Sequence, residues 1–189
     1  ESAGGASVVA LLAARDAQPY FAKAWAMSPS IGQYSDIERS KQQVNDLLVH
    51  AGVSSEQELR QLSSSALLIA QQKVIDHSNE QFSAFAPTQD DVVLPLDLLD
   101  AAAKNPKPFV IGTNKDESRL WVMFDPNENQ LDELGAVKAL STRAANASDI
   151  WSLYKSSRPT YGPSQIVAAY DSDANFRKHA WNLLKTREE

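Results

Sequence analysis

The sequence opens on Glu1-Ser2-Ala3-Gly4-Gly5-Ala6-Ser7-Val8, and an apolar run continues from there to Ala14. The small and aliphatic residues after Gly5 predict a buried helix. A serine just before a helix, followed after one residue by a glycine, matches the second half of the G-x-S-x-G nucleophile elbow, in which the serine stands on a sharp turn from strand to helix. Small residues also begin many helices, so an ordinary serine at a helix N-terminus is the alternative.

An elbow at this position would give three residues defined tasks. The hydroxyl of Ser2 would be the nucleophile, and the backbone N–H of Ala3 would point at the oxyanion that forms when a carbonyl is attacked. The helix N-terminus would add a partial positive charge beneath that oxyanion. Gly4 would allow the helix and the preceding strand to approach closely where a side chain would clash.

The composition excludes several classes of protein. Of the 189 residues, 18 are basic and 24 are acidic, and a net charge of −6 gives no reason to expect a nucleic-acid partner. There are no cysteines, which excludes disulfides, thiolate zinc sites and cysteine nucleophiles and favours a cytoplasmic location. The longest apolar run, 6–14, is too short to span a bilayer, so we expect no membrane segment.

Two strands are expected among many helices. Phe109-Val110-Ile111-Gly112-Thr113 is apolar on both faces, as in the interior of a parallel sheet, and 24–27 is a second short apolar run that ends at Ser28-Pro29-Ser30. We expect helices over 37–51 with Gly52 closing the helix, after Ser55, over 67–75 and 98–103, and from about Asp173 onward. The four tryptophans are expected in the core: Trp25, Trp121, Trp151 and Trp181.

Carboxylates stand out at two places. The polar cluster Asn114-Lys115-Asp116-Glu117 follows the strand at 109–113 directly. Taken alone, Glu117 would be a solvated loop charge between Lys115 and Arg119. Asp90 and Asp91 lack further ligands at a fixed spacing, so a turn is expected there and no metal site.

The opening residues resemble type-B carboxylesterases, the family of cholinesterases and bacterial p-nitrobenzyl esterases. The family pattern is Gly-Glu-Ser-Ala-Gly-Gly-x-Ser-Val, and Glu1–Val8 match everything after its first glycine. The segment PYFAKAWAMSPS (19–30) is similar to the family's Leu-Phe-x-x-Ala-Ile-x-Gln-Ser-Gly-Ser, with Pro29 in place of its glycine.

Later segments resemble the family in the same order. QELRQLSSSALLIAQ (57–71) is similar to a helix pair that contains Leu-Arg, and FAPTQDDVVLP (85–95) to Phe-x-Pro-x-x-Asp-Gly-x-x-Leu-Pro, with Val92 taken as the residue in the place of the glycine. FVIGTNKDESRLW (109–121) resembles Ile-Gly-x-Asn-x-Asp-Glu-Gly. YDSDANFRKHAWNLL (170–184) resembles a later helix of the family, with His179 in place of a proline.

The resemblance implies a fold and an activity. The chain is expected to be a helix-rich part of an α/β-hydrolase fold, with 1–189 as the central part of a single domain, lacking the N-terminal strands and the C-terminal histidine segment. It implies a serine hydrolase that cleaves carboxylic esters of small molecules through an acyl-enzyme, without a cofactor. Ser2 would be the nucleophile, Glu117 the acid of a Ser-Glu-His triad, and the Ala3 N–H an oxyanion donor. The absence of cysteines favours the bacterial branch of the family.

The histidine of this triad is not found in the sequence. In the α/β-hydrolase order it follows the acid, and both His50 and His77 precede Glu117. His179 follows Glu117 but lies on the flank of an amphipathic helix without the neighbouring glycine that the family has, so it is expected to be a surface helix residue. We therefore expect the chain to be an internal piece of a larger esterase and to be inactive, or nearly so, alone.

Two other functions remain open. The first is a non-catalytic binding or adhesion protein on the same fold, like the neuroligin-like relatives of the family, although the presence of both Ser2 and Glu117 argues against it. The second is a complete small helical interaction module, which explains the strand at 109–113 poorly. The ester substrate and the oligomeric state do not follow from the sequence.

Overall fold

The computed structural model describes residues 1–32, 34–78 and 84–188, and the chain divides into two compact units. One unit consists of Glu1–Val9, Phe21–Gly32 and Pro106–Glu189. The other consists of Ala10–Tyr20 and Gln33–Asn105. No helix among the described residues is both long enough and apolar enough to cross a lipid bilayer.

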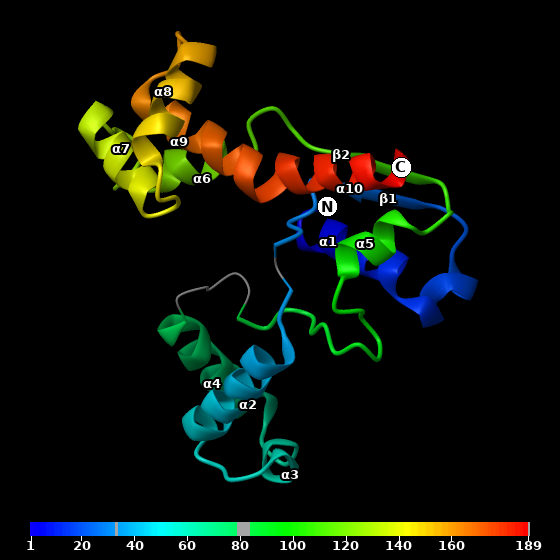
Figure 1. The fold of residues 1–189 in the computed structure, drawn as a ribbon. Coiled ribbons are helices and arrows are strands. Elements are labelled where there is room, and N and C mark those ends of the chain that lie inside the picture. Colours follow the sequence, from blue (N-terminus) through cyan, green and yellow to red (C-terminus); the bar gives the residue numbers. More distant parts are fainter. Residues whose placement is uncertain (33, 79–83, 189) are drawn as a thin grey trace. The chain divides into compact units, whose positions relative to one another are not determined.

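The first unit contains the two expected strands, which pair in parallel. β1 (Ala24–Met27) and β2 (Phe109–Gly112) lie side by side, with Trp25 opposite Val110 (Figure 1). The ladder continues beyond the strands, because the N–H of Ser28 donates to the carbonyl of Gly112 at 2.7 Å. The carboxyl ends of both strands therefore lie at the same edge.

The expectation that both faces of these strands are buried is wrong. Ala26 is fully buried, whereas Trp25 is 65% exposed and Val110 is 57% exposed. Trp25 and Val110 are partners in the ladder, so they lie on the same, open face. A parallel sheet is buried on both faces only where other elements cover both, and in the described part of this unit one face of the strand pair stays uncovered.

The first unit also holds a helical core. It is built by α7 (Glu133–Ser141), α8 (Ala147–Ser157) and α9 (Pro163–Ser172), and α6 (Arg119–Phe124) packs against α9. These helices bury one apolar cluster: Ala136, Leu140, Ala147, Trp151, Ile166 and Val167. Of the four tryptophans expected in the core, only Trp151 is buried. Trp25, Trp121 and Trp181 are 65%, 59% and 65% exposed.

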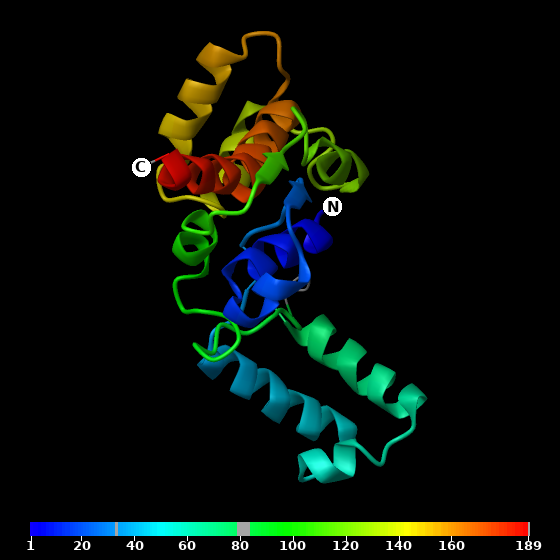
Figure 2. The same cartoon turned by 90° about the vertical axis from the view of Figure 1, so that its right-hand side faces the viewer.

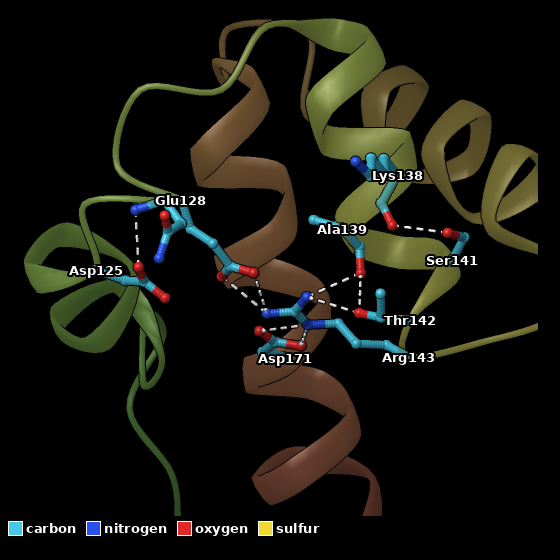
Figure 3. A network of polar contacts seen from close by, with 9 residues as sticks. Asp125, Glu128, Lys138, Ala139, Ser141, Thr142, Arg143 and Asp171 are labelled. Carbon is cyan, nitrogen blue, oxygen red and sulfur yellow. Dashed lines mark hydrogen bonds and ion pairs between the residues drawn. The ribbon is translucent and has the colours of Figure 1, made fainter.

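Arg143, just after α7, joins three segments of this unit (Figure 3). Its guanidinium donates to both oxygens of Glu128 at 2.8 Å and to the two oxygens of Asp171 at 2.9 and 3.1 Å. It also donates to the carbonyl of Ala139 at 2.8 Å. Arg suits this position because its planar guanidinium carries N–H groups on separate nitrogens: Nε serves Asp171, while Nη2 serves Glu128.

The C-terminal helical run is longer than the sequence suggested. Instead of a helix that begins near Asp173, α9 continues through a π-helical turn (Asp173–Arg177) into α10 (Lys178–Glu188), the orange-to-red run in Figure 2. Pro163 stands in the first turn of α9, where its missing N–H costs no hydrogen bond. A π turn absorbs an extra residue without ending a helix, so the polar residues near Asp173 mark no boundary. Ala180 and Leu183 of α10 are buried.

The second unit contains a helical hairpin of α2 (Ile37–Ala51) and α4 (Ser64–His77), which pack against each other. Gly52 ends α2 in the left-handed conformation at φ 70°, as the sequence predicted. The short α3 (Glu56–Leu59) begins at Ser55, whose hydroxyl accepts from the N–H of Glu58 at 3.3 Å. The unit also includes the 3-10 turn Arg15–Tyr20 and α5 (Leu98–Ala103).

α1 (Ala3–Ala13) is the helix expected after Gly5.

The loop before α5 shows that the glycine of the family pattern was matched to the wrong residue. One oxygen of Asp90 accepts from the N–H groups of Val92, Val93 and Leu94, and these bonds hold the pKa of Asp90 below its usual value. The pair of aspartates therefore builds a turn, as expected. The residue in the left-handed conformation is Asp91, at φ 59°, so the glycine of the family pattern corresponds to Asp91 and not to Val92.

Candidate active site

Ser2 has a strained backbone at the start of α1. Its φ is 52°, in the left-handed region that side chains other than glycine rarely adopt. The N–H of Ser2 donates to the carbonyl of Met27, the last residue of β1, at 3.1 Å. The carbonyl of Ser2 accepts from the N–H of Ala6 at 2.9 Å, which ties it to the first turn of the helix. Ser2 is exposed and stands on a sharp turn beside the carboxyl end of β1.

Ala3 is the first residue of α1. The first N–H groups of a helix have no partner within the helix and carry the positive end of its dipole. The position therefore offers a backbone donor one residue after the serine. This is the geometry that an oxyanion donor requires.

The glycine that allows close packing is Gly5, not Gly4. A β-carbon on Gly5 would lie 2.8 Å from the carbonyl oxygen of Met27 and 3.0 Å from the α-carbon of Pro29, whereas one on Gly4 would meet nothing within 4 Å. The assignment to Gly4 was wrong because Gly5 is the glycine on the side of the helix that faces the end of β1. Because Gly5 has no side chain, the first turn of α1 can pack closely against the end of β1.

Glu117 lies in the turn after β2 and is half-buried. One of its carboxylate oxygens accepts from the N–H of Asn114 at 2.5 Å and the other from the side-chain amide of Asn114 at 3.2 Å. From the other side, the guanidinium of Arg177 donates to the carbonyls of Asn114 and Lys115 at 3.2 and 2.9 Å. The loop that carries Glu117 is thus fixed by the π turn before α10.

Ser118 fixes the residue next to Glu117. Its N–H donates to the hydroxyl of Ser172 at 2.9 Å, and this hydroxyl donates to the carbonyl of Ala168 at 2.7 Å. Both serines are buried, with Ser172 fully so. The family pattern has a glycine at the position of Ser118, and the side chain here is accommodated in the buried space beside α9.

Two residues that the sequence did not single out connect the serine end and the acid end of the site. Ser28 is buried, has a φ of 44°, and follows β1 directly. Its hydroxyl accepts from the side-chain amide of Asn114 at 3.4 Å, the same amide that donates to Glu117. Ser2 and Glu117 thus lie at the same edge of the two-stranded sheet. Asn114 was part of the polar cluster after the strand at 109–113 and matches the Asn of the family pattern, but neither signal gave it a role.

No histidine joins this group among the described residues, where both hydrogen bonds that Glu117 accepts come from Asn114. His50 and His77 belong to the helical hairpin of the second unit, with ring centroids 5.1 Å apart. His179 lies in α10 and is half-buried, so its assignment as a surface residue needs correction. Burial, with the neighbouring charge of Lys178, lowers the pKa of His179.

The described part of the chain contains no group of three or more histidine, aspartate or glutamate side chains arranged to hold a metal ion. The site offers instead a hydroxyl on a strained turn, a helix N-terminus and a carboxylate held by an amide. These are the elements of nucleophilic chemistry by a serine.

A parallel strand pair with helices and a strained serine at the carboxyl edge of the strands is part of an α/β-hydrolase fold. The chain belongs to the carboxylesterase family, whose model matches residues 1–184. No curated protein matches the chain.

Solved structures of bacterial esterases share this fold. The Geobacillus stearothermophilus carboxylesterase EST55 superposes with a TM-score of 0.78 at 23% identity over 98% of this chain and 40% of that chain. A PNB esterase has a TM-score of 0.69 at 26% identity, with 100% of this chain and 39% of that chain covered. A thermophilic PNB esterase has a TM-score of 0.69 at 25% identity over 98% and 38%. The chain spans about two fifths of the length of these structures.

Proposed function

We propose that the protein to which this chain belongs hydrolyses carboxylic esters of small molecules, with Ser2 as the nucleophile and Glu117 as the acid of a Ser-Glu-His triad. The observation that carries the proposal is the left-handed backbone of Ser2, at the N-terminus of α1 and hydrogen-bonded to the end of β1. Strain of this kind persists where the surrounding structure enforces it, and it is common at active sites. Membership in the carboxylesterase family supports the reaction class.

The reaction assigns one task to each group. The histidine takes the proton of the Ser2 hydroxyl as its oxygen attacks the ester carbonyl, and the N–H of Ala3 donates to the oxyanion that forms. The histidine then gives the proton to the departing alcohol, which leaves an acyl group on Ser2. Water, deprotonated by the same histidine, releases the acid and restores Ser2. The carboxylate of Glu117 accepts the other imidazole N–H and stabilises the charged ring.

We also propose that the histidine comes from outside these 189 residues and that the chain alone does not turn over esters. His50 and His77 precede Glu117 in the chain, against the α/β-hydrolase order, and His179 lies within a regular helix, in α10. The solved esterases are about two and a half times as long as this chain, which leaves room for the missing residue. Without a base, the Ser2 hydroxyl is a weak nucleophile at neutral pH.

The test uses the protein encoded by the whole reading frame, with a p-nitrophenyl ester as substrate and a fluorophosphonate as a covalent label. Ser2→Ala should lower kcat by about 10³-fold or more and abolish labelling, because the nucleophile and base act as a unit. The matched control is Ser7→Ala, which removes an exposed hydroxyl from the same helix. For the acid, Glu117→Gln is compared with Glu38→Gln on the exposed face of α2. Full activity of Ser2→Ala would reject Ser2 as the nucleophile, whereas neither hydrolysis nor labelling by the unaltered protein would favour a binding protein on this fold.

A further inference from the structure

We infer that the first unit binds a small oxyanion, a carboxylate or a phosphate group, in a pocket beside the loop that carries Glu117. The pocket has a volume of about 400 Å³. Its lining includes Lys115, Arg158, Arg177, Asn114 and Tyr161. This site is separate from the roles proposed for Ser2 and Glu117 and does not depend on them.

Positive charge exceeds negative charge around this pocket. Arg158 and Arg177 share a single carboxylate, that of Asp173: Arg158 lies 3.4 Å from one of its oxygens, and Arg177 pairs with the other. Lys115 is exposed and has no ion-pair partner among the described residues. The three cations are therefore only partly compensated, and a bound anion would complete the balance.

One further carboxylate lines the pocket and does not remove this excess. Asp116 lies 4.0 Å from Arg119, which is outside the pocket, so part of its charge is balanced there. The hydroxyl of Tyr154 donates to Asp173 at 2.8 Å and competes with the two guanidinium groups for that carboxylate. Both effects leave the pocket with a net positive charge.

The two guanidinium groups are held in place before any ligand arrives. Arg158 lies over the ring of Tyr154, 4.7 Å from its centroid, and donates to the hydroxyl of Ser157 at 3.0 Å. Arg177 is fixed by the carbonyls of Asn114 and Lys115. Groups that are already ordered lose little conformational entropy on binding, so little of their electrostatic attraction for the anion is offset by that loss. Arg favours oxyanions in particular because its planar fork matches two oxygens at once.

Neutral donors complete the lining. The pocket includes Thr113 and Tyr161, whose hydroxyl groups can donate to oxygen. A pocket lined by three cationic side chains and two hydroxyl groups suits a compact polar anion better than an ester's alkyl chain. Carboxylate and phosphate are both compact anions whose oxygens accept hydrogen bonds, so the lining suits either one. The titration described next distinguishes them.

The test follows backbone amide signals of the whole 189-residue chain by NMR while inorganic phosphate, or acetate, is added at constant ionic strength. Saturable shifts at Thr113, Lys115 and Arg158 are expected. Lys115→Gln should weaken binding by about tenfold, as expected for the loss of one charge-assisted contact. The matched control is Lys138→Gln, the same change of charge on the exposed face of α7, which should bind like the unaltered chain. A response to phosphate alone, or to acetate alone, would identify which oxyanion the pocket takes.

A second variant keeps the result interpretable. Lys115 makes no described side-chain contact, so Lys115→Gln is not expected to disturb folding, whereas Arg158→Gln is checked by the amide spectrum before it is titrated. Shifts that rise linearly with both anions, or that are the same in Lys115→Gln and Lys138→Gln, would overturn the inference.

Discussion

Asn114 binds both oxygens of Glu117, one through its backbone N–H at 2.5 Å and the other through its side-chain amide at 3.2 Å. The same amide lies 3.4 Å from the hydroxyl of Ser28, at the end of β1. The orientation of the carboxylate is therefore set by a residue that also contacts the strand next to Ser2. A carboxylate that must orient an imidazole needs this kind of support, since a loop side chain would otherwise rotate freely.

The first prediction is that Asn114 positions Glu117 in the whole enzyme. Asn114→Ala keeps the backbone bond and loses the amide, so kcat for a p-nitrophenyl ester should fall by about tenfold while KM changes little. Asn114→Asp should lower kcat further, because a second carboxylate beside Glu117 repels its charge. Asn182→Ala, an exposed position on α10, serves as the control. A tenfold rise of KM in Asn114→Ala, with kcat unchanged, would contradict this role.

The second prediction concerns the two glycines of the first turn of α1. Gly5→Ala should lower the free energy of unfolding by roughly 1–3 kcal/mol, because the new β-carbon would lie 2.8 Å from the carbonyl oxygen of Met27. Gly4→Ala is the matched control: its β-carbon meets nothing within 4 Å, and alanine favours a helix by up to about 1 kcal/mol over glycine. Urea unfolding of both variants checks the difference. Equal midpoints would show that the close contact at Gly5 relaxes at no cost.

Local structure was more predictable than exposure. The left-handed end of α2 at Gly52 and the bounds of α5 follow from neighbouring residues alone, and both were predicted correctly. The exposure of Trp25 and Val110 depends on which elements cover the sheet, and a residue's own chemistry does not report this. The continuation of α9 past Asp173 depends on a π turn, for which no sequence pattern was recognised.

The same division holds for the site. Ser2 and Glu117 were found because each stands in a motif of adjacent residues. Ser28 and Asn114 were not, since their contact joins positions 86 residues apart and exists only once β1 and β2 have paired. The close-packing glycine was misassigned by one position because the sequence shows that a glycine is needed, but not which side of the helix faces the strand.

The third prediction is that Arg143 is among the most costly side chains to remove in the first unit. Its guanidinium neutralises the partly buried carboxylates of Glu128 and Asp171, whose side chains are only 18% and 14% exposed (Figure 3). Arg143→Met would leave both without a partner and should lower the free energy of unfolding by roughly 3 kcal/mol. Arg143→Lys should recover only part of this, because one ammonium nitrogen replaces the separate nitrogens that serve Asp171 and Glu128.

The measurement for Arg143 is urea unfolding of the 189-residue chain, with Lys138→Met as the control on the exposed side of α7. If Arg143→Lys were as stable as the unaltered chain, the separate nitrogens of the guanidinium would contribute nothing and a single positive charge would suffice.

The fourth prediction is a loss of stability on mild acidification that traces to His179. Burial, reinforced by the charge of Lys178, lowers the pKa of His179 in the folded chain below its ordinary value of 6.5. As the pH falls through 6.5, the unfolded chain binds a proton that the folded chain does not, so the folded state loses stability until the pH drops below the folded pKa. His179→Gln should remove this part of the pH dependence, and His77→Gln should leave it in place. Urea midpoints between about pH 8 and pH 5, the range in which histidine titrates, provide the comparison. A slope in His179→Gln as steep as in the unaltered chain would assign the acid sensitivity to another group.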